Sequence, residues 1–358
     1  MNIVVINIWN GQLNRGAETW SQQLVQQALG NGISAMLIGG GGTSTSGNMV
    51  VVPTPVQDNS GVPTLASRLK IYGRLDSYAY SVITFTVKAL RRGLVDDADI
   101  VIPINGMWQI LLLRLYRSLH QCRYRIVYVN HPGSEVSREI SIASPDLVVL
   151  LKHDTRTHKL SQRIPRTVIP NGVSMGQYRV MDPPRRRTLL CVSALIPYKR
   201  VDWAIHVAKA GGVGLHVVGD GPLAAIVKEM GEQILGSDFS IKVLPHEKMP
   251  LQFGLATALI HTASATENFP MVFLESLAAN RPVLTFDTPT NREILGDAGV
   301  FAQDLDDMKR LVQTESVWNR INRLIEDGVP RNRAEHFDWS VILPRYIDEF
   351  GQLIGARH

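Results

Sequence analysis

Two glutamates, Glu267 and Glu275, are separated by seven residues and enclose the start of a predicted helix. Pro270 suits the first turn of that helix, because its fixed φ is already helical and its missing N–H would be unpaired there anyway. Asn280 suits the left-handed position that ends a helix. The pattern therefore predicts a short helix from about Pro270 to Ala279, with one carboxylate just before it and the other inside it.

The start of this helix is predicted to bind an anion. An apolar run at 258–263 (ALIHTA) precedes it, so the helix begins at the carboxyl end of a strand. Free amides at Met271 and Val272, together with the helix dipole, favour a phosphate group. Two carboxylates beside it would repel that phosphate unless they bound hydroxyl groups instead. The hydroxyls of a sugar and of a ribose meet this requirement.

The segment 267–283 (ENFPMVFLESLAANRPV) resembles the signature of the retaining family 4 glycosyltransferases, which have the GT-B fold. Four further segments resemble that family in the same order along the chain. They are Gly16-Ala17-Glu18 (its Gly-Gly-x-Glu loop), 168–173 (VIPNGV), 192–202 (VSALIPYKRVD, its Gly-Arg-Leu…Lys-Gly segment) and 217–223 (VVGDGPL, its Gly-x-Gly-Pro turn). The resemblance thus spans nearly the whole chain.

The resemblance implies a role for each matching residue. Glu275 would bind the ribose hydroxyls of a nucleotide sugar, and Glu267 would contact hydroxyls of the transferred sugar. Lys199 would neutralise the donor diphosphate. The residues implied to bind the donor are Gly16, Lys199, Phe269, Pro270, Met271, Val272 and Glu275. His131, in the segment YVNHPGSE, matches a histidine near the reacting sugar, and with Glu267 it is the candidate catalytic residue.

Two positions depart from the family pattern. Ser193 and Ala194 stand where the family has Gly-Arg, so the arginine that accompanies Lys199 at the diphosphate is missing. Arg200 is a candidate substitute. Arg15 replaces the first glycine of the Gly-Gly loop, and its guanidinium could also reach a phosphate. These two departures leave two alternatives to the family's usual activity, which are weak catalysis and a different donor.

The elements that must position these residues follow an α/β pattern. Continuous apolar runs alternate with helical patterns in both halves, which is typical of a parallel sheet covered on both faces. The predicted strands are 2–9, 34–40, 48–54, 97–105, 125–130, 145–151, 188–195, 214–220, 240–245, 258–263 and 282–286. The predicted helices include 18–29, 63–92, 201–210 and 223–235, besides the one at Pro270.

The chain is expected to have two Rossmann-like domains facing across a cleft. Its 358 residues exceed the usual size of a single core, and Pro183-Pro184 followed by three arginines breaks every periodicity. We predict an acceptor domain at 1–178, a linker at 179–187 and a donor domain at 188–336. A final amphipathic helix within 337–358 is predicted to cross back to the first domain, as the resemblance implies.

Charge is distributed unevenly along the chain. Up to Val173 there are 17 Lys and Arg against 10 Asp and Glu, whereas the remainder holds 20 against 22. The basic half suggests an anionic partner (a nucleic acid, a phospholipid surface or a phosphorylated acceptor), and a solvated face without a partner is the alternative. The stretch from Trp108 to Arg125 interleaves apolar and basic residues, which suits either a helix lying on anionic lipid or one that covers the sheet.

The cysteines, the N-terminal segment and the histidines bear on cellular location and metal binding. The two cysteines, Cys122 and Cys191, are too few for a disulfide framework, so a reducing, cytoplasmic location is expected, with the inner face of the membrane as an alternative. The apolar start 2–9 lacks a basic flank and a cleavage site, and it predicts a strand. His153, His158, His246 and His261 have no metal-ligand spacing and are interpreted as surface or core residues.

We therefore expect a retaining, metal-independent hexosyltransferase of polysaccharide, lipopolysaccharide or glycolipid synthesis. A nucleotide diphosphate sugar would be its co-substrate, with no separate cofactor. The acceptor would be a glycan or a lipid-linked sugar, anionic or held on an anionic membrane, and nucleic acid is not expected. The alternatives are a GT-B nucleotide-sugar epimerase and a catalytically impaired nucleotide-sugar-binding protein. A glycosidase using Glu267 and Glu275 is disfavoured, because hydrolysis needs no nucleotide.

Overall fold

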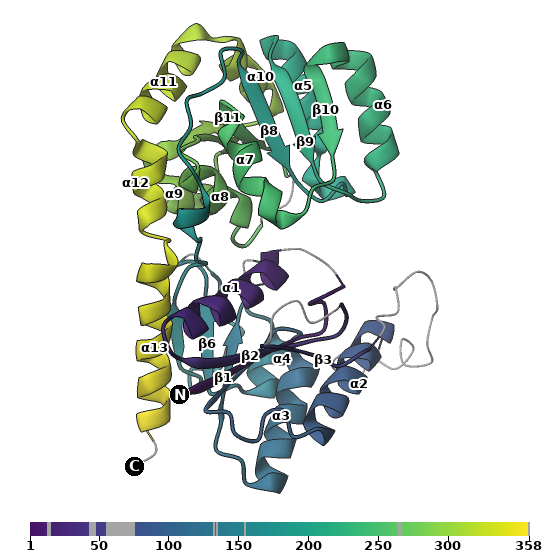
Figure 1. The fold of residues 1–358 in the computed structure, drawn as a ribbon, viewed down its shortest axis with the longest axis vertical. Helices are drawn as coiled ribbons and strands as arrows, with labels where there is room; N and C mark the ends of the chain where they lie inside the picture. Colours follow the sequence, from purple (N-terminus) through teal and green to yellow (C-terminus); the bar gives the residue numbers. More distant parts are fainter. Residues whose placement is uncertain are drawn as a thin grey trace. The chain divides into compact units, whose positions relative to one another are not determined.

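The computed structural model describes residues 1–12, 16–42, 48–54, 76–131, 133, 135–153, 155–263 and 267–356. They form two compact units, each built on its own parallel sheet with helices around it (Figure 1). The first unit comprises Met1–Pro170 and Leu343–His358, and the second comprises Asn171–Ile342. The prediction of two Rossmann-like parallel-sheet domains is confirmed.

The first unit holds a seven-stranded sheet in the order β3-β2-β1-β4-β5-β6-β7. Its strands are β1 (Asn2–Asn7), β2 (Ser34–Gly39), β3 (Met49–Val51), β4 (Ile100–Pro103), β5 (Arg125–Val129), β6 (Leu147–Leu150) and β7 (Arg166–Val168). In β1, each side chain from Ile3 to Ile6 is at most 1% exposed. Both faces of the strand are therefore buried, which explains why its sequence is continuously apolar rather than alternating.

Helices of the first unit cover its sheet. They are α1 (Gly16–Gly30), α2 (Ser77–Arg91), α3 (Met107–His120) and α4 (Arg138–Ala143). Phe85, Ile110 and Ile140, from α2, α3 and α4, share one apolar core with β1 and β4. Helix α1 packs Trp20 against Tyr346 of the terminal helix α13 (Trp339–Gly355), with ring centroids 5.9 Å apart. The terminal helix thus returns to the first unit, as expected, while the predicted helical residues 63–75 lie outside the described part of the chain.

The second unit holds a six-stranded parallel sheet in the order β10-β9-β8-β11-β12-β13. Its strands are β8 (Thr188–Val192), β9 (Gly214–Val218), β10 (Phe239–Lys242), β11 (Ala258–His261), β12 (Val283–Phe286) and β13 (Gly299–Ala302). Its helices are α5 (Val201–Gly211), α6 (Ala224–Leu235), α7 (Met249–Gly254), α8 (Met271–Ala278), α9 (Pro289–Leu295), α10 (Leu305–Gln313), α11 (Glu315–Glu326) and α12 (Val329–Glu335). Buried side chains of α5, α10 and α11 share a core with β8, β9 and β11.

The predicted linker 179–187 lies inside the second unit, which already begins at Asn171. Backbone hydrogen bonds explain this difference, because Val173 N–H donates to Phe337 O at 2.8 Å and so fixes the incoming chain to the segment before α13. A Cβ on Gly172 would lie 2.5 Å from the Trp339 ring, so this close approach requires glycine. Farther along, the guanidinium of Arg281, which is 1% exposed, donates to Met181 O at 2.7 Å. The composition of 179–187 gave no sign of these contacts.

Candidate functional site

Lys199 and Glu267 lie at the point where the strand order of the second sheet reverses. Strand β8 is followed along the chain by β9 on one side, while β11 lies on its other side, so the β8/β11 boundary is a topological switch point. Lys199 ends a short 3-10 helix, η3 (Pro197–Lys199), that follows β8, and Glu267 follows β11. Ligands of open α/β sheets bind at such a point, outside the carboxyl ends of the strands.

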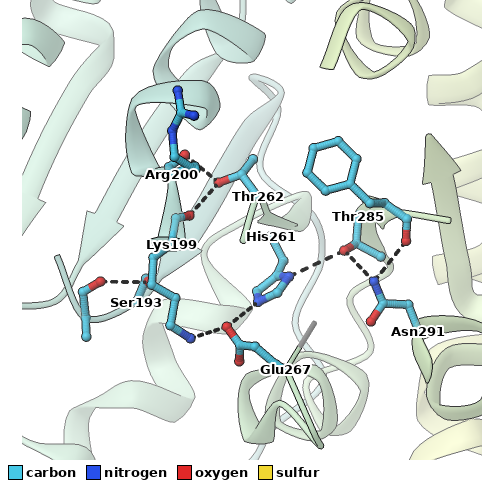
Figure 2. Close-up of polar contacts among 10 residues, drawn as sticks. Ser193, Lys199, Arg200, His261, Thr262, Glu267, Thr285 and Asn291 are labelled. Atoms are coloured by element: carbon cyan, nitrogen blue, oxygen red, sulfur yellow. Dashed lines mark hydrogen bonds and ion pairs between the residues drawn. The ribbon is translucent and has the colours of Figure 1, made fainter. Parts of the chain in front are cut away.

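The two side chains form an ion pair (Figure 2). Lys199 Nζ donates to Glu267 Oε1, and the exposed fractions of the two side chains are 16% and 18%. Burial alone would raise the pKa of Glu267, but its hydrogen-bond and electrostatic interactions with His261 and with Lys199 lower it to about 2. Glu267 is therefore ionised at neutral pH, and the site holds one cation and one anion that neutralise each other.

His261 makes the second contact to Glu267. Its Nε2 lies 3.3 Å from Glu267 Oε1, and its Nδ1 lies 3.4 Å from Thr285 Oγ1 on β12. The sequence pattern around His261 predicts a surface or core residue. The available signal was its position as the last residue of the strand that leads to Glu267, but the direction of a side chain at a strand end cannot be read from spacing alone.

Thr262, the next residue, holds the other partner of the ion pair. Its hydroxyl contacts the carbonyl oxygens of Lys199 and Arg200 at 3.2 and 2.8 Å (Figure 2). Successive residues of an extended chain point to opposite sides. His261 and Thr262 can therefore serve Glu267 and the backbone of Lys199 at the same time.

Arg200, the predicted substitute for the missing arginine, is engaged elsewhere. Its guanidinium makes a bidentate pair with Asp202, with Nε–Oδ1 and NH2–Oδ2 distances of 2.9 and 2.6 Å, and lies 3.9 Å from the ring centroid of Trp203. Its backbone is left-handed, with φ of 48°, and its side chain points away from that of Lys199 (Figure 2). In this structure Arg200 is therefore not positioned as a free phosphate contact, and Arg15 lies outside the described residues.

Helix α8 begins at Met271, directly after Pro270, and ends before Asn280, whose φ is +58°. The predicted start and the left-handed end are both confirmed, with Pro270 at the capping position. No side chain of the described residues caps the start. The amides of Met271 and Val272 lie in the first turn, where a helix leaves its N–H groups without internal acceptors.

Glu275 lies inside α8 and is 5% exposed. Burial raises its pKa, while the charge of His246 and the nearby Tyr178 hydroxyl act in the opposite direction. That hydroxyl is itself buried beside the carboxylate. Glu275 is thus a buried carboxylate without a compensating cation pair among the described residues. Phe269, just before α8, is 9% exposed and packs edge to face on Phe337.

The candidates of the first unit gather near the carboxyl ends of β1 and β5. His131 follows β5, and its ring meets Trp20 edge to face with centroids 4.7 Å apart. Burial lowers the pKa of His131 to about 3, so the ring is neutral at physiological pH. Gly16 is the exposed first residue of α1, and two residues later Glu18 is buried, with Asn7 Nδ2 at 3.4 Å from its Oε1.

The basic stretch after Trp108 forms α3, which covers the first sheet. Trp108 packs against the apolar core, and Arg117 pairs with Asp146 at 2.6 Å. Leu115 and Leu119 remain 58% and 70% exposed. Trp108 is therefore not an exposed aromatic anchor, because its ring packs against the apolar core of the first unit. Over the described residues, no helix is both long and apolar enough to span a membrane.

The sequence of this chain is similar to that of known proteins. Residues 181–336 match the family described as Glycosyl transferases group 1. An exopolysaccharide phosphotransferase of Streptomyces coelicolor is 29% identical over 233 residues, which is 59% of this chain and 24% of that protein. The chain thus spans about a quarter of that relative's length.

Solved structures show the same fold. Sucrose-phosphate synthase of Thermosynechococcus elongatus aligns over 99% of both chains with a TM-score of 0.76 and 14% identity. Anabaena HepE with UDP and glucose aligns over 98% of this chain and 100% of its own, with a TM-score of 0.71 and 15% identity. The pneumococcal O-GlcNAc transferase GtfA with UDP and GlcNAc covers 99% of both chains (TM-score 0.65, 12% identity). At these identities the likeness establishes the GT-B fold.

Proposed function

We propose that this chain, whose residues 181–336 match the glycosyl transferases group 1 family, transfers a sugar from a nucleotide diphosphate sugar to an acceptor hydroxyl with retention of configuration. One observation carries the proposal above the others. Lys199, Glu267, the open start of α8 and the buried Glu275 all lie at the switch point of the second sheet.

In this proposal each group has a distinct partner on the donor. Lys199 and the amides of Met271 and Val272 hold the diphosphate, whose leaving charge must be stabilised. An ammonium carries three N–H donors, so Lys199 can contact a phosphate oxygen while it keeps one hydrogen bond to Glu267. Glu275 accepts from the ribose hydroxyls, and Glu267 accepts from a hydroxyl of the transferred sugar.

The reaction would proceed by attack on the face that the diphosphate leaves. The bond between the anomeric carbon and the phosphate oxygen breaks, the bond to the acceptor oxygen forms, and the departing phosphate takes the acceptor proton. His131 would lie beside the reacting sugar, where its neutral ring can exchange hydrogen bonds without adding charge. With Lys199 and the helix start on the diphosphate, we propose that no divalent cation is required.

We propose a glycan or lipid-linked acceptor that is anionic or is held on an anionic surface. The excess of basic residues up to Val173 supports this, and the exopolysaccharide assignment of the Streptomyces relative favours polysaccharide synthesis. We place the protein in the cytoplasm or at the inner face of the membrane. Co-sedimentation with vesicles tests the membrane contact, which we expect to rise with the fraction of anionic lipid and to fall with salt.

A catalytically impaired nucleotide-sugar-binding protein is the second candidate. The observation in its favour is that Ala194 replaces an arginine and that Arg200, engaged with Asp202, does not replace it. Such a protein would bind a nucleotide sugar and release no product. A nucleotide-sugar epimerase would instead change the sugar with no acceptor present.

One screen separates these functions. Thermal unfolding is measured with UDP, GDP and their sugars, because a ligand that binds the folded state raises the melting temperature. The donors that do so are then incubated with and without glycan acceptors, and the products are weighed by mass spectrometry. The proposal expects an acceptor-dependent mass gain of one sugar. A sugar change without acceptor would establish the epimerase, and binding without any product would establish the binding protein.

A further inference from the structure

His261 stands between Glu267 and a buried polar pair. It is 8% exposed and its ring packs edge to face on Phe273 of α8, with centroids 4.9 Å apart. Beyond it lie Thr285, fully buried on β12, and Asn291 on α9 (Figure 2). These groups form one continuous chain of polar contacts that ends on the Glu267 carboxylate.

The donor and acceptor of each hydrogen bond in this series of contacts can be assigned by starting from Asn291. Asn291 Nδ2 lies 2.9 Å from Phe286 O, and a carbonyl only accepts, so the amide nitrogen faces that side. The same nitrogen lies 3.2 Å from Thr285 Oγ1 and donates to it. Thr285 thus accepts from Asn291, and among the described residues its own hydroxyl hydrogen has one acceptor, His261 Nδ1 at 3.4 Å.

This direction determines which nitrogen of His261 carries the proton. If Nδ1 accepts from Thr285, the neutral ring carries its hydrogen on Nε2, which lies 3.3 Å from Glu267 Oε1. The same oxygen accepts from Lys199. Both donors therefore converge on Oε1, and Oε2 has no hydrogen-bond partner among the described residues.

We propose that His261 is a positioning residue that orients Glu267, and that Thr285, fixed by Asn291, sets its Nε2–H tautomer. With Oε1 held by two donors, Oε2 is the acceptor presented to the transferred sugar. The donor must then place a hydroxyl hydrogen, rather than an acceptor or an apolar group, at that oxygen. This inference rests on the proposed function for its link to the sugar, but the tautomer itself does not.

The tautomer is tested without any turnover. In protein with ¹⁵N-labelled histidine at pH 7.5, the His261 ring should show a protonated Nε2 and an unprotonated Nδ1. Thr285→Val keeps the shape of the side chain and removes the hydroxyl, so we expect it to change the His261 ring shifts. Thr314→Val, at the exposed end of α10, is the matched control and should leave them unchanged. Protonation on Nδ1, or on both nitrogens, overturns the proposal.

The positioning role is tested by kinetics with the donor and acceptor found in the screen. His261→Leu removes the hydrogen bond to Glu267 and should lower kcat about 10- to 100-fold, with the KM for the donor changed less than about threefold, because misplacing a reacting group costs rate rather than ground-state binding. His261→Gln places an amide donor near the former Nε2 and should recover most of that loss. His206→Gln, exposed on α5, is the control with unchanged kcat.

The two hypotheses fail differently. If His261→Leu keeps full kcat while Glu267→Gln loses it, the positioning role is wrong and the proposed function stands. If Glu267→Gln also keeps full kcat, the role of Glu267 in the proposed function is wrong, whatever the tautomer of His261.

Discussion

Lys199 and Glu267 form an ion pair in the second unit although they lie 68 positions apart along the chain. Each was expected to contact a different part of a nucleotide sugar, the lysine its diphosphate and the glutamate its sugar. In the structure they pair with each other instead. The pair therefore holds both side chains in place before the donor binds, and this lowers the cost of ordering them.

Replacing Lys199 tests its role at the diphosphate. Lys199→Met removes the ammonium but keeps most of the stem, so the Kd for a nucleoside diphosphate should rise about 10- to 100-fold, as expected for a charge-assisted hydrogen bond of about 1.5–3 kcal/mol. Isothermal titration calorimetry measures this change. Lys209→Met, on the far part of α5, is the control. Equal Kd values in Lys199→Met and the control would contradict the assignment.

The pKa of Glu267 gives a dependence of stability on pH. This pKa is about 2, below the ordinary value of 4.5, so the folded state keeps the carboxylate charged where the unfolded chain already takes up a proton. Its contribution to stability is fully present above about pH 4.5 and is lost as the pH falls toward 2. We expect the unfolding free energy in urea to fall more steeply below about pH 4.5 in the wild type than in Glu267→Gln. Identical slopes would show that neither His261 nor Lys199 stabilises the Glu267 carboxylate in solution.

Glu275 is expected to lower the stability of the folded protein at high pH while it contributes to nucleotide binding. Burial raises its pKa, so the folded state holds a proton more tightly than the unfolded chain, and stability decreases as the pH rises above about 4.5. Glu275→Gln removes this cost. We expect the melting temperature of the free variant to equal or exceed that of the wild type at pH 8, while the shift caused by a nucleoside diphosphate falls to less than half. A variant that melts lower yet keeps the full shift would indicate a purely structural carboxylate.

Turnover should persist without divalent cations. Lys199 and the start of α8 are proposed to carry the diphosphate charge, so dialysis against EDTA should leave kcat unchanged within about twofold. The assay compares the dialysed enzyme with the same enzyme after Mg²⁺ or Mn²⁺ is restored. A loss of activity that added metal reverses would require a cation on the diphosphate.

Much of the architecture was predictable because it depends on local chemistry. Continuous apolar runs identified the buried parallel strands, since both faces of such a strand are covered, and β1 and β12 occupy the predicted segments. Pro270 and Asn280 marked the ends of α8 because each has a backbone preference that needs no knowledge of its neighbours. The edge strands β7 and β13 were missed, because their runs are short.

The contacts of the site could not be predicted in the same way. Arg200 looked available for phosphate, but its left-handed backbone and the nearby Asp202 decide where its guanidinium points. His261 meets Glu267 only because β11 and the residues after it bring the two together, and its other partner comes from β12. Such pairings depend on tertiary direction, which residue spacing alone does not encode.

Turnover by Glu275→Ala tests the proposed transferase site most directly. The variant is compared with the wild type on the true nucleotide-sugar donor and acceptor, with product counted by mass spectrometry and the anomeric configuration read by proton NMR. The proposed transferase site predicts a retained configuration in the wild type and a loss of turnover of at least about 100-fold in the variant. Full turnover by Glu275→Ala, or an inverted product from the wild type, would contradict it.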